Sequence, residues 1–430
     1  MTDVTPSTGE LVPRGVPRFI DGWARSLVIH LLRHIRYGRI CLRDGAFRDS
    51  FGEVDEFNVE AVITVQHPRF YRRVALGGNA ALGESFADGD WSCDCLPSLF
   101  RILARHAEII DKSERGFGRI GGFAARIAHA LRRNSRRGSR RNISAHYDAG
   151  DEFFEHVLDD TMSYSCGIFD TDSSTLYDAS VSKLERVCRM LSLQPDDHLL
   201  EIGTGWGGLA LHAATHYGCR VTTTTISRNQ YEYARARVEA AGLQDRITIL
   251  LRDYRDLSGS FDKLVSIEMI EAVGDRYYDQ FFRRCCELVS VDGQMLLQAI
   301  TIGDNRYAKA RRRADFIKQF VFPGSCIPSL SRLSRSIASQ TDYRIVHLED
   351  IGPHYARTLR EWRENLTASS DAIRSLGYSE RFLKLWEYYF AYCEGGFAER
   401  FIGDIQMLLV RPRCRTSLPV SVQSVAMSHG

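Results

Sequence analysis

Residues 199–208 read Leu-Leu-Glu-Ile-Gly-Thr-Gly-Trp-Gly-Gly, an apolar run that leads directly into a glycine-rich turn. Gly203, Gly205, Gly207 and Gly208 carry no Cβ, so a ligand can approach the main chain where a helix is about to begin. The spacing is E-x-G-x-G-x-G-G rather than the G-x-G-x-x-G of dinucleotide sites. It suits S-adenosylmethionine (SAM), which has no pyrophosphate to place at a helix N-terminus. The stretch therefore predicts a strand, a turn and a helix that build a cofactor site.

Further apolar and β-branched runs follow the glycine turn. They cover residues 220–226, 247–251, 261–269 and 295–302, with helical stretches between them. Strands that alternate with helices form parallel βαβ units, and ligands of such sheets bind beyond the carboxyl ends of the strands. We therefore predict an α/β fold with a Rossmann-like sheet. Polar groups expected at one common pocket are the glycine turn, Thr225, Gln230, Asp253, Glu271 and Gln298.

Length and composition indicate a two-domain globular protein. The chain has 430 residues, which is too long for one hydrophobic core. Its content of 44% hydrophobic and 26% charged residues is typical of a globular protein. We expect an N-terminal domain with a basic linker over 1–140, a catalytic domain over 141–411 and a disordered tail over 412–430. No window of about 18 apolar residues and no secretory signal is present, so we expect a cytoplasmic protein. The eleven cysteines form no paired C-x-x-C sets, which predicts reduced thiols and no metal site.

The net charge is only +2, but the basic residues are concentrated. Residues 101–141 hold twelve Lys or Arg against three acidic side chains. A solvated linker is the simplest interpretation of this stretch. A basic stretch beside a cofactor domain also suits anionic phospholipid headgroups, which would place the protein peripherally at the inner face of the membrane. Nucleic acid is disfavoured, because no aromatic and basic residues alternate in the manner of RNA-binding modules.

Several motifs occur on both sides of the glycine turn. They are His-Tyr-Asp-Ala-Gly-Asp-Glu-Phe-Phe at 146–154, Met-Ser-Tyr-Ser-Cys at 162–166, Arg-Asp-Tyr-Arg-Asp at 252–256 and Phe-Pro-Gly-Ser-Cys-Ile-Pro-Ser at 322–329. Pro-Arg-Phe-Tyr-Arg-Arg at 68–73 adds an N-terminal segment. Together they resemble the cyclopropane-fatty-acyl-phospholipid synthases and the related mycolic-acid cyclopropane synthases, from about residue 60 to about residue 411.

The resemblance implies a SAM-dependent methyltransferase that acts on unsaturated acyl chains of membrane phospholipids. A methyl group would leave the sulfonium of SAM for a cis double bond, and the resulting carbocation would lose a methyl proton as a cyclopropane ring closes. Positioning in a dry pocket supplies much of the acceleration of such a step. The aromatic-rich residues 303–400 are the expected helical lipid-binding cap. A homodimer is a further possible partner arrangement, which the sequence does not decide.

In the family a bound bicarbonate removes the proton, held by a cysteine, a glutamate, a histidine, an isoleucine backbone and a tyrosine. Cys166, Glu271 and Ile300 match three of these positions. Gln298 stands where the histidine is expected and Arg363 where the tyrosine is expected. An amide can donate to an anion but does not titrate, and a guanidinium brings a permanent charge. We therefore expect either bicarbonate or a different base.

The same resemblance assigns the SAM contacts. Tyr164 and Ser165 should close over the methionine end, Thr225 and Gln230 should meet the ribose, and Tyr254 and Arg255 should border the adenine. The loop residues expected to contact the cofactor are Glu201, Gly203, Gly205, Trp206 and Gly207. Without the resemblance, Cys166 would be taken as a small core residue and Thr225 as an ordinary strand residue. Glu268 is either part of the same wall as Glu271 or exposed.

Three alternatives to cyclopropanation remain open at this stage. Loss of a different proton would leave a methylated, still unsaturated chain, which a reductase could convert to a methyl-branched one. A lipid-binding protein that has lost its catalytic base would also explain Gln298 and Arg363. A methyltransferase for small molecules or proteins is disfavoured by the N-terminal domain and by the Tyr-Ser-Cys motif.

Overall fold

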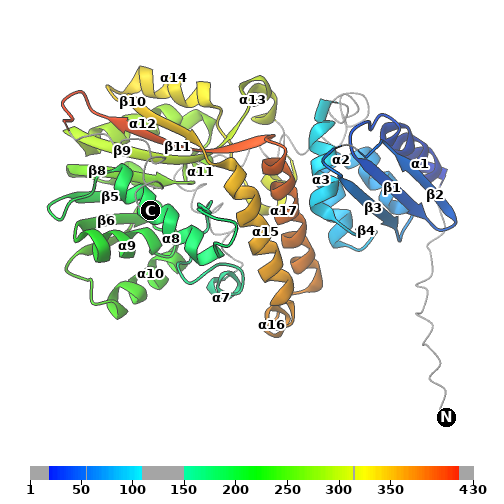
Figure 1. Ribbon diagram of the computed structural model, residues 1–430, viewed down its shortest axis with the longest axis horizontal. Helices are drawn as coiled ribbons and strands as arrows, with labels where there is room; N and C mark the ends of the chain where they lie inside the picture. Colours follow the sequence, from blue (N-terminus) through cyan, green and yellow to red (C-terminus); the bar gives the residue numbers. More distant parts are fainter. Residues whose placement is uncertain (1–18, 55, 109–149, 313–314, 416–430) are drawn as a thin grey trace, which may run out of the picture. The chain divides into compact units, whose positions relative to one another are not determined.

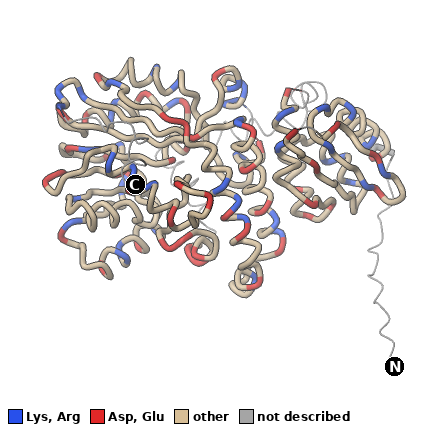
Figure 2. Tube along the Cα trace, viewed as in Figure 1, with Lys and Arg blue, Asp and Glu red and all other residues tan. Residues whose placement is uncertain are grey.

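The computed structural model describes residues 19–54, 56–108, 150–312 and 315–415 (Figure 1). The chain divides into two compact units, residues Met1–Gly121 and Gly122–Gly430. The expected boundary at residue 140, most of the basic segment and residues 416–430 of the expected tail lie outside the described residues. No described helix combines the length and the apolar run needed to cross a membrane. Lys and Arg positions are interspersed with Asp and Glu positions along the described backbone of each unit (Figure 2).

The described residues of the N-terminal unit form a four-stranded sheet and three helices. Its strands lie in the order β2-β1-β3-β4, and β1 and β3 run parallel. The buried carboxylate of Asp90 accepts from Arg73 Nη1 at 2.8 Å and also pairs with Arg69, which accounts for two of the three arginines of the 68–73 motif. The elements are α1 (Phe19–Leu32), β1 (Arg39–Asp44), β2 (Phe47–Phe51), β3 (Glu60–Val65), α2 (Arg69–Ala87), β4 (Trp91–Cys93) and α3 (Leu96–Arg105).

The second unit is built on a seven-stranded sheet in the order β10-β11-β9-β8-β5-β6-β7. Five strands are parallel, as predicted: β5 (His198–Ile202), β6 (Arg220–Thr225), β7 (Ile247–Leu251), β8 (Phe261–Ile267) and β9 (Val289–Ile302). Two antiparallel strands that were not predicted, β11 (Ile402–Val410) and β10 (Arg344–Asp350), extend the sheet beyond β9. The Rossmann-like α/β fold is confirmed.

Alternate residues of the central strands enter two separate cores. Leu200, Leu264 and Leu297 pack against α12 (Tyr278–Leu288) and α14 (Leu330–Gln340) on one face. Their neighbours Leu199, Val265 and Leu296 pack against α8 (Leu176–Met190), α9 (Gly208–Tyr217) and α10 (Arg228–Ala240) on the other. Since successive side chains of a strand point to opposite faces, strands covered on both faces need continuous apolar runs. The sheet is therefore the rigid platform on which the loops at its carboxyl edge are held.

Residues 303–400 are largely helical, as expected, but they also contain β10. The helices α15 (Gly352–Ala368) and α17 (Glu380–Ala398) lie side by side (Figure 1). Buried aromatic rings fill their interface, with Trp362 against Phe390 at 5.9 Å between ring centroids.

The smaller described elements are α7 (Asp151–Glu155), α11 (Ile270–Val273), α13 (Asp304–Ala310), a π-helical turn (Ile317–Val321), α16 (Ser370–Ser375) and short 3-10 turns at Tyr254–Asp256 and Asp275–Tyr277.

Candidate functional site

A cavity opens at the carboxyl ends of β5, β6 and β8. The glycine turn, the end of β6 and residues 252–255 line one side of it. Apolar side chains, among them Met269 and Phe322, line another. Among the residues assigned to SAM, those that line the cavity are Tyr164, Ser165, Glu201, Gly203, Gly205, Trp206, Thr225, Gln230, Tyr254 and Arg255.

The glycine turn has the backbone shape that the sequence implied. Gly203 and Gly205 adopt φ of 107° and 53°, values that side chains other than glycine rarely take. The N–H groups of Gly203 and Thr204 donate to Thr224 O and fix the turn to β6. A Cβ on Gly205 would meet no atom within 4 Å, so this glycine faces open space. Gly207 does not line the cavity; it precedes α9 and approaches Ala234, where a Cβ would lie 3.2 Å from that side chain.

Two buried ionisable groups lie beside the turn. Glu201, at the end of β5, accepts from Thr223 Oγ1 at 2.6 Å, and burial raises the pKa of its carboxyl to about 8. Lys183 on α8 donates to Ser165 Oγ at 3.0 Å, and burial lowers the pKa of its amine. Sequence reasoning missed Lys183. The available signal is that Lys183 lies on the apolar stripe of an amphipathic helix, next to Leu184 and one turn before Val187.

The adenine side of the predicted site is also held by hydrogen bonds. The carboxylate of Asp253 accepts from Arg255 Nε at 2.8 Å and from Arg255 Nη2 at 2.6 Å, which fixes the guanidinium. That guanidinium lies 5.6 Å from the ring centroid of Tyr254, in a cation–π arrangement. Nearby, at the end of β6, Thr225 Oγ1 donates to Gln230 Oε1 at 2.9 Å. These groups are ordered before a ligand arrives, which lowers the entropic cost of binding.

Carboxyl groups gather at the end of the cavity next to β8. Glu268 Oε1 accepts from the backbone N–H of Cys166 at 2.8 Å and from Gln298 Nε2 at 2.8 Å. Glu271 Oε1 accepts from the backbone N–H of Ile300 at 2.6 Å. Four residues assigned to catalysis, Cys166, Glu271, Gln298 and Ile300, therefore lie around Glu268. Of these five, only Glu268 lines the cavity itself.

The structure places Arg363 away from this cluster. Its Nε donates to Glu394 Oε2 on α17 at 2.9 Å. The phenol near the cluster belongs instead to Tyr355, which donates to Glu268 Oε2 at 2.6 Å. The reason is the helical period: Tyr355, Leu359 and Trp362 form the buried stripe of α15, and Arg363 is turned about 100° from Trp362.

Burial changes the ionisation of these carboxyl groups. It raises the pKa of Glu271 to about 8, and the negative charge of Glu268 adds to this rise. Burial also raises the pKa of Glu268, although its three donors oppose the rise, and burial raises the pKa of Asp404 on β11 well above its ordinary value. The charge of Glu268 adds to the rise for Asp404, whereas the hydrogen bonds that Glu268 accepts from Tyr355, Cys166 N–H and Gln298 favour its carboxylate form.

Aromatic rings from the cap cover the cavity. The ring of Tyr164 stacks on Trp362 with centroids 5.0 Å apart, and its hydroxyl donates to Tyr389 Oη at 3.2 Å. Phe154 packs against Trp206 of the glycine turn at 4.8 Å. This covering joins the cap to the cofactor turn through apolar contacts, and it is suited to exclude water from the reacting atoms.

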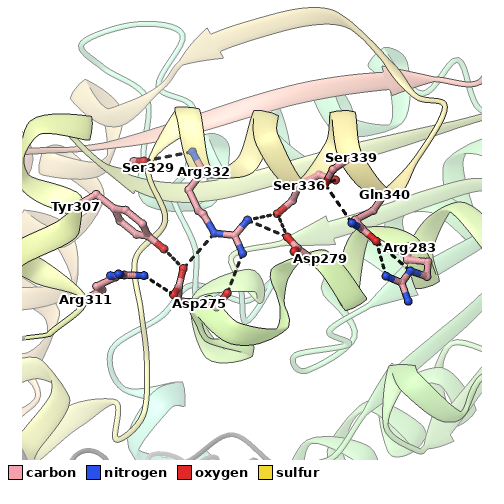
Figure 3. Close-up of polar contacts among 10 residues, drawn as sticks. All are labelled: Asp275, Asp279, Arg283, Tyr307, Arg311, Ser329, Arg332, Ser336, Ser339 and Gln340. Carbon is pink, nitrogen blue, oxygen red and sulfur yellow. Dashed lines mark hydrogen bonds and ion pairs between the residues drawn. The ribbon is translucent and has the colours of Figure 1, made fainter.

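A polar network joins the loop after α11 to α12, α13 and α14 (Figure 3). Asp275, directly after α11, accepts from Arg332 Nε at 3.1 Å, from Arg311 Nη1 at 2.9 Å and from Tyr307 Oη. Arg332 also donates to Asp279 on α12 (Figure 3). The network ties α13 and α14 to the loop after Glu271.

The residues present fit SAM but not bicarbonate. For SAM, the open face of Gly205, the carboxyl of Glu201 and the ring of Tyr254 surround one cavity. For bicarbonate, the expected donors are already used, because Cys166 N–H and Gln298 donate to Glu268 and Ile300 N–H donates to Glu271. A second anion would have to displace these two side chains from their donors and bear the repulsion of the Glu268 carboxylate.

Comparison with known proteins gives consistent matches. The family model for mycolic acid cyclopropane synthetase matches residues 134–407. Tuberculostearic acid methyltransferase UfaA1 of Mycobacterium tuberculosis is 36% identical over 359 residues, 79% of this chain and 81% of that protein. The cyclopropane-fatty-acyl-phospholipid synthase of Escherichia coli strain K12 is 37% identical over 350 residues, 81% of this chain and 86% of that protein.

Solved structures of similar fold include two cyclopropane synthases. The cyclopropane synthase MmaA2 from Mycobacterium tuberculosis superposes with a TM-score of 0.59 at 28% identity, over 63% of this chain and 98% of that one. The mycolic acid cyclopropane synthase CmaA1, complexed with SAH and CTAB, gives a TM-score of 0.59 at 30% identity, with the same coverage.

Proposed function

Because the chain belongs to the mycolic acid cyclopropane synthetase family, we propose that it is a SAM-dependent enzyme that converts unsaturated phospholipid acyl chains to cyclopropane acyl chains. A methylene from SAM would be added across a cis double bond. The single observation that carries this proposal is that the glycine turn, the apolar side chains of Met269 and Phe322 and the carboxylate of Glu268 line one cavity.

The residues of this cavity provide what the reaction requires. When bound, SAM supplies an electrophilic methyl group on a sulfonium. Tyr164 and Trp362 keep water from the reacting atoms, and Lys183 orients Ser165. The carboxylate of Glu268 stabilises positive charge that develops on the acyl chain, and such preorganised electrostatic stabilisation is a major part of enzyme catalysis.

Methylation without ring closure is the second candidate function. It is favoured by the similarity to tuberculostearic acid methyltransferase UfaA1 and by Gln298, which stands where the resemblance expects a histidine. Ring closure and methyl-alkene formation differ in which proton the acyl chain loses, and a saturated methyl-branched chain would need a separate reductase.

We further propose that the enzyme works peripherally at a phospholipid surface on the cytoplasmic side, reached through its basic segment. Twelve Lys or Arg between residues 101 and 141 support this, since each basic residue near an anionic surface contributes about 1 kcal/mol. Neither a homodimer nor a nucleic-acid partner is required by the proposal.

The test uses the purified full chain, SAM and vesicles of anionic phospholipid with cis-monounsaturated chains. The expected result is release of S-adenosylhomocysteine and a lipid mass gain equal to one CH2 group. Proton NMR then separates ring hydrogens from methyl and vinyl hydrogens. Matched vesicles with saturated chains are the control, and equal release from both vesicle types would refute the proposal.

A further inference from the structure

Glu268 has a backbone conformation that calls for an explanation. It follows the last residue of β8 with φ of 47°, in the left-handed region that residues other than glycine seldom adopt. Such a conformation costs of order 1 kcal/mol or more, and it is found mainly where the surrounding structure needs the side chain in one place. Here it brings a carboxylate to the wall of the cavity.

The donors around this carboxylate are the ones expected around a bound bicarbonate. Cys166 and Gln298 occupy two of the five positions that the resemblance assigns to that ion, and both donate to Glu268 Oε1 at 2.8 Å. The role of the tyrosine is taken by Tyr355, which donates to Oε2 at 2.6 Å. A side-chain carboxylate and a bicarbonate present the same pair of oxygens to such donors.

We propose that the carboxylate of Glu268 replaces bicarbonate and is itself the base that removes the proton in the final step. This inference rests on the proposed function. It makes the proton acceptor part of the chain, where the resemblance implies a bound ion.

The step balances without any further reactant. The bond between the methyl carbon and sulfur breaks with its electron pair on sulfur, while the π electrons of the alkene form the new C–C bond and leave a carbocation. Glu268 then takes a proton from the new methyl group, and the C–H electron pair closes the ring onto the cationic carbon. The proton on Glu268 passes to water once the product has left.

Glu271 is less suited to this task. Its Oε1 accepts from the N–H of Ile300, its Oε2 has no hydrogen-bond partner among the described residues, and it does not line the cavity. Glu268 lines the cavity and accepts hydrogen bonds from three donors, which favour its carboxylate form. The carboxyl groups of Asp404 and Glu271 and the amine of Lys183 also act on Glu268 electrostatically.

The test compares wild type, Glu268→Gln and Glu268→Gly in CO2-free buffer, with and without added bicarbonate. We expect wild-type kcat to change less than twofold on adding bicarbonate. Glu268→Gln should lose roughly 100-fold or more in kcat, the usual range for a lost general base. Glu268→Gly relaxes the positive φ and leaves the donors free, so added bicarbonate should raise its rate at least tenfold.

Two further measurements make the outcomes decisive. Calorimetric titration with S-adenosylhomocysteine should give the same Kd within about threefold for all three proteins, which shows that the variants fold. Glu239→Gln on the exposed face of α10 is the matched control and should have wild-type activity.

The inference is overturned if wild type needs bicarbonate, if Glu268→Gln keeps more than a tenth of kcat, or if bicarbonate fails to rescue Glu268→Gly. A purely structural role for Glu268 would give no rescue. Failure of the proposed function looks different, because wild type would then release no S-adenosylhomocysteine with unsaturated vesicles under any buffer.

Discussion

The Glu271 carboxyl should make the protein less stable as the pH rises. It is 9% exposed, and its Oε2 has no hydrogen-bond partner among the described residues. Burial, with the charge of Glu268, raises its pKa to about 8, whereas an unfolded glutamate titrates near its ordinary pKa of about 4.3. Between these values the folded state keeps a proton that the unfolded state has lost. The free energy of unfolding therefore falls as pH rises through this window.

The size of the effect follows from the width of the window. One pKa unit corresponds to about 1.4 kcal/mol, and two units lie between pH 6 and the folded pKa of about 8. Raising the pH from 6 to 9 should thus remove about 3 kcal/mol of stability through this one group. Glu271→Gln stays neutral throughout and keeps an oxygen to accept from Ile300 N–H. Relative to wild type, the variant should gain about 3 kcal/mol over the same range.

Urea unfolding of both proteins, followed by tryptophan fluorescence at four pH values from 6 to 9, measures this difference. Taking the difference between variants cancels the contributions of all other titrating groups that the substitution leaves unchanged. Glu239→Gln serves as the control, since its carboxyl is exposed and paired only on the surface with Arg235. Parallel stability curves for wild type and Glu271→Gln would refute the reasoning, because they would mean that Glu271 titrates normally in the folded protein.

Three other predictions follow from single contacts. Tyr355→Phe removes a hydrogen bond to a carboxylate, worth about 1.5–3 kcal/mol, and should lower kcat about 10- to 100-fold. Arg363→Gln should change kcat less than about threefold, because the partner of Arg363 is Glu394 and not Glu268. Both variants are measured by release of S-adenosylhomocysteine. If Tyr355→Phe and Arg363→Gln lowered kcat equally, the assignment of Tyr355 to the Glu268 cluster would be wrong. Lys183→Met removes the hydrogen bond to the Ser165 hydroxyl and should weaken the binding of S-adenosylhomocysteine about three- to tenfold, measured by calorimetry. An unchanged Kd would show that the Lys183–Ser165 hydrogen bond does not position Ser165 for the ligand. Asp275→Ala leaves basic donors without their acceptor and should cost about 2–3 kcal/mol in urea unfolding, where a loss below about 1 kcal/mol would show that solvent screens the network.

The sequence predicted the parallel strands and the cofactor turn, because both depend on local patterns. Residues 247–251 form the predicted strand with the predicted bounds, and the bare backbone of Gly205 faces the cavity. The added strand β11 was missed although much of it is apolar. Buried polar residues Asp404 and Gln406 interrupt its pattern, and their partners lie more than 100 residues earlier on β9.

In the candidate site, too, the residues that depend on partners distant in the chain could not be predicted from local sequence patterns. Alignment along the chain pointed to Arg363, whereas the helix presents Tyr355 to the cluster two turns earlier. Glu268 was left undecided between the wall of the site and the surface. Its place depends on a positive φ and on three donors from distant segments, and no local sequence pattern encodes these.

The hydrogen bonds of Gln298 explain why a glutamine stands where the family resemblance expects a histidine. Its Nε2 donates to Glu268 at 2.8 Å and to Asp404 at 3.1 Å, and its Oε1 accepts from Gln406 Nε2 at 3.0 Å. A neutral imidazole has one donor and one acceptor, so a histidine could satisfy at most two of these three partners. A buried carboxylate or amide left without its bond costs about 1–3 kcal/mol. The presence of Gln298 and the presence of the Glu268 carboxylate are therefore linked. A site whose base is the side chain of Glu268 needs an amide at residue 298 to satisfy its neighbours. A histidine at this position suits a site whose base is a bicarbonate bound from solution.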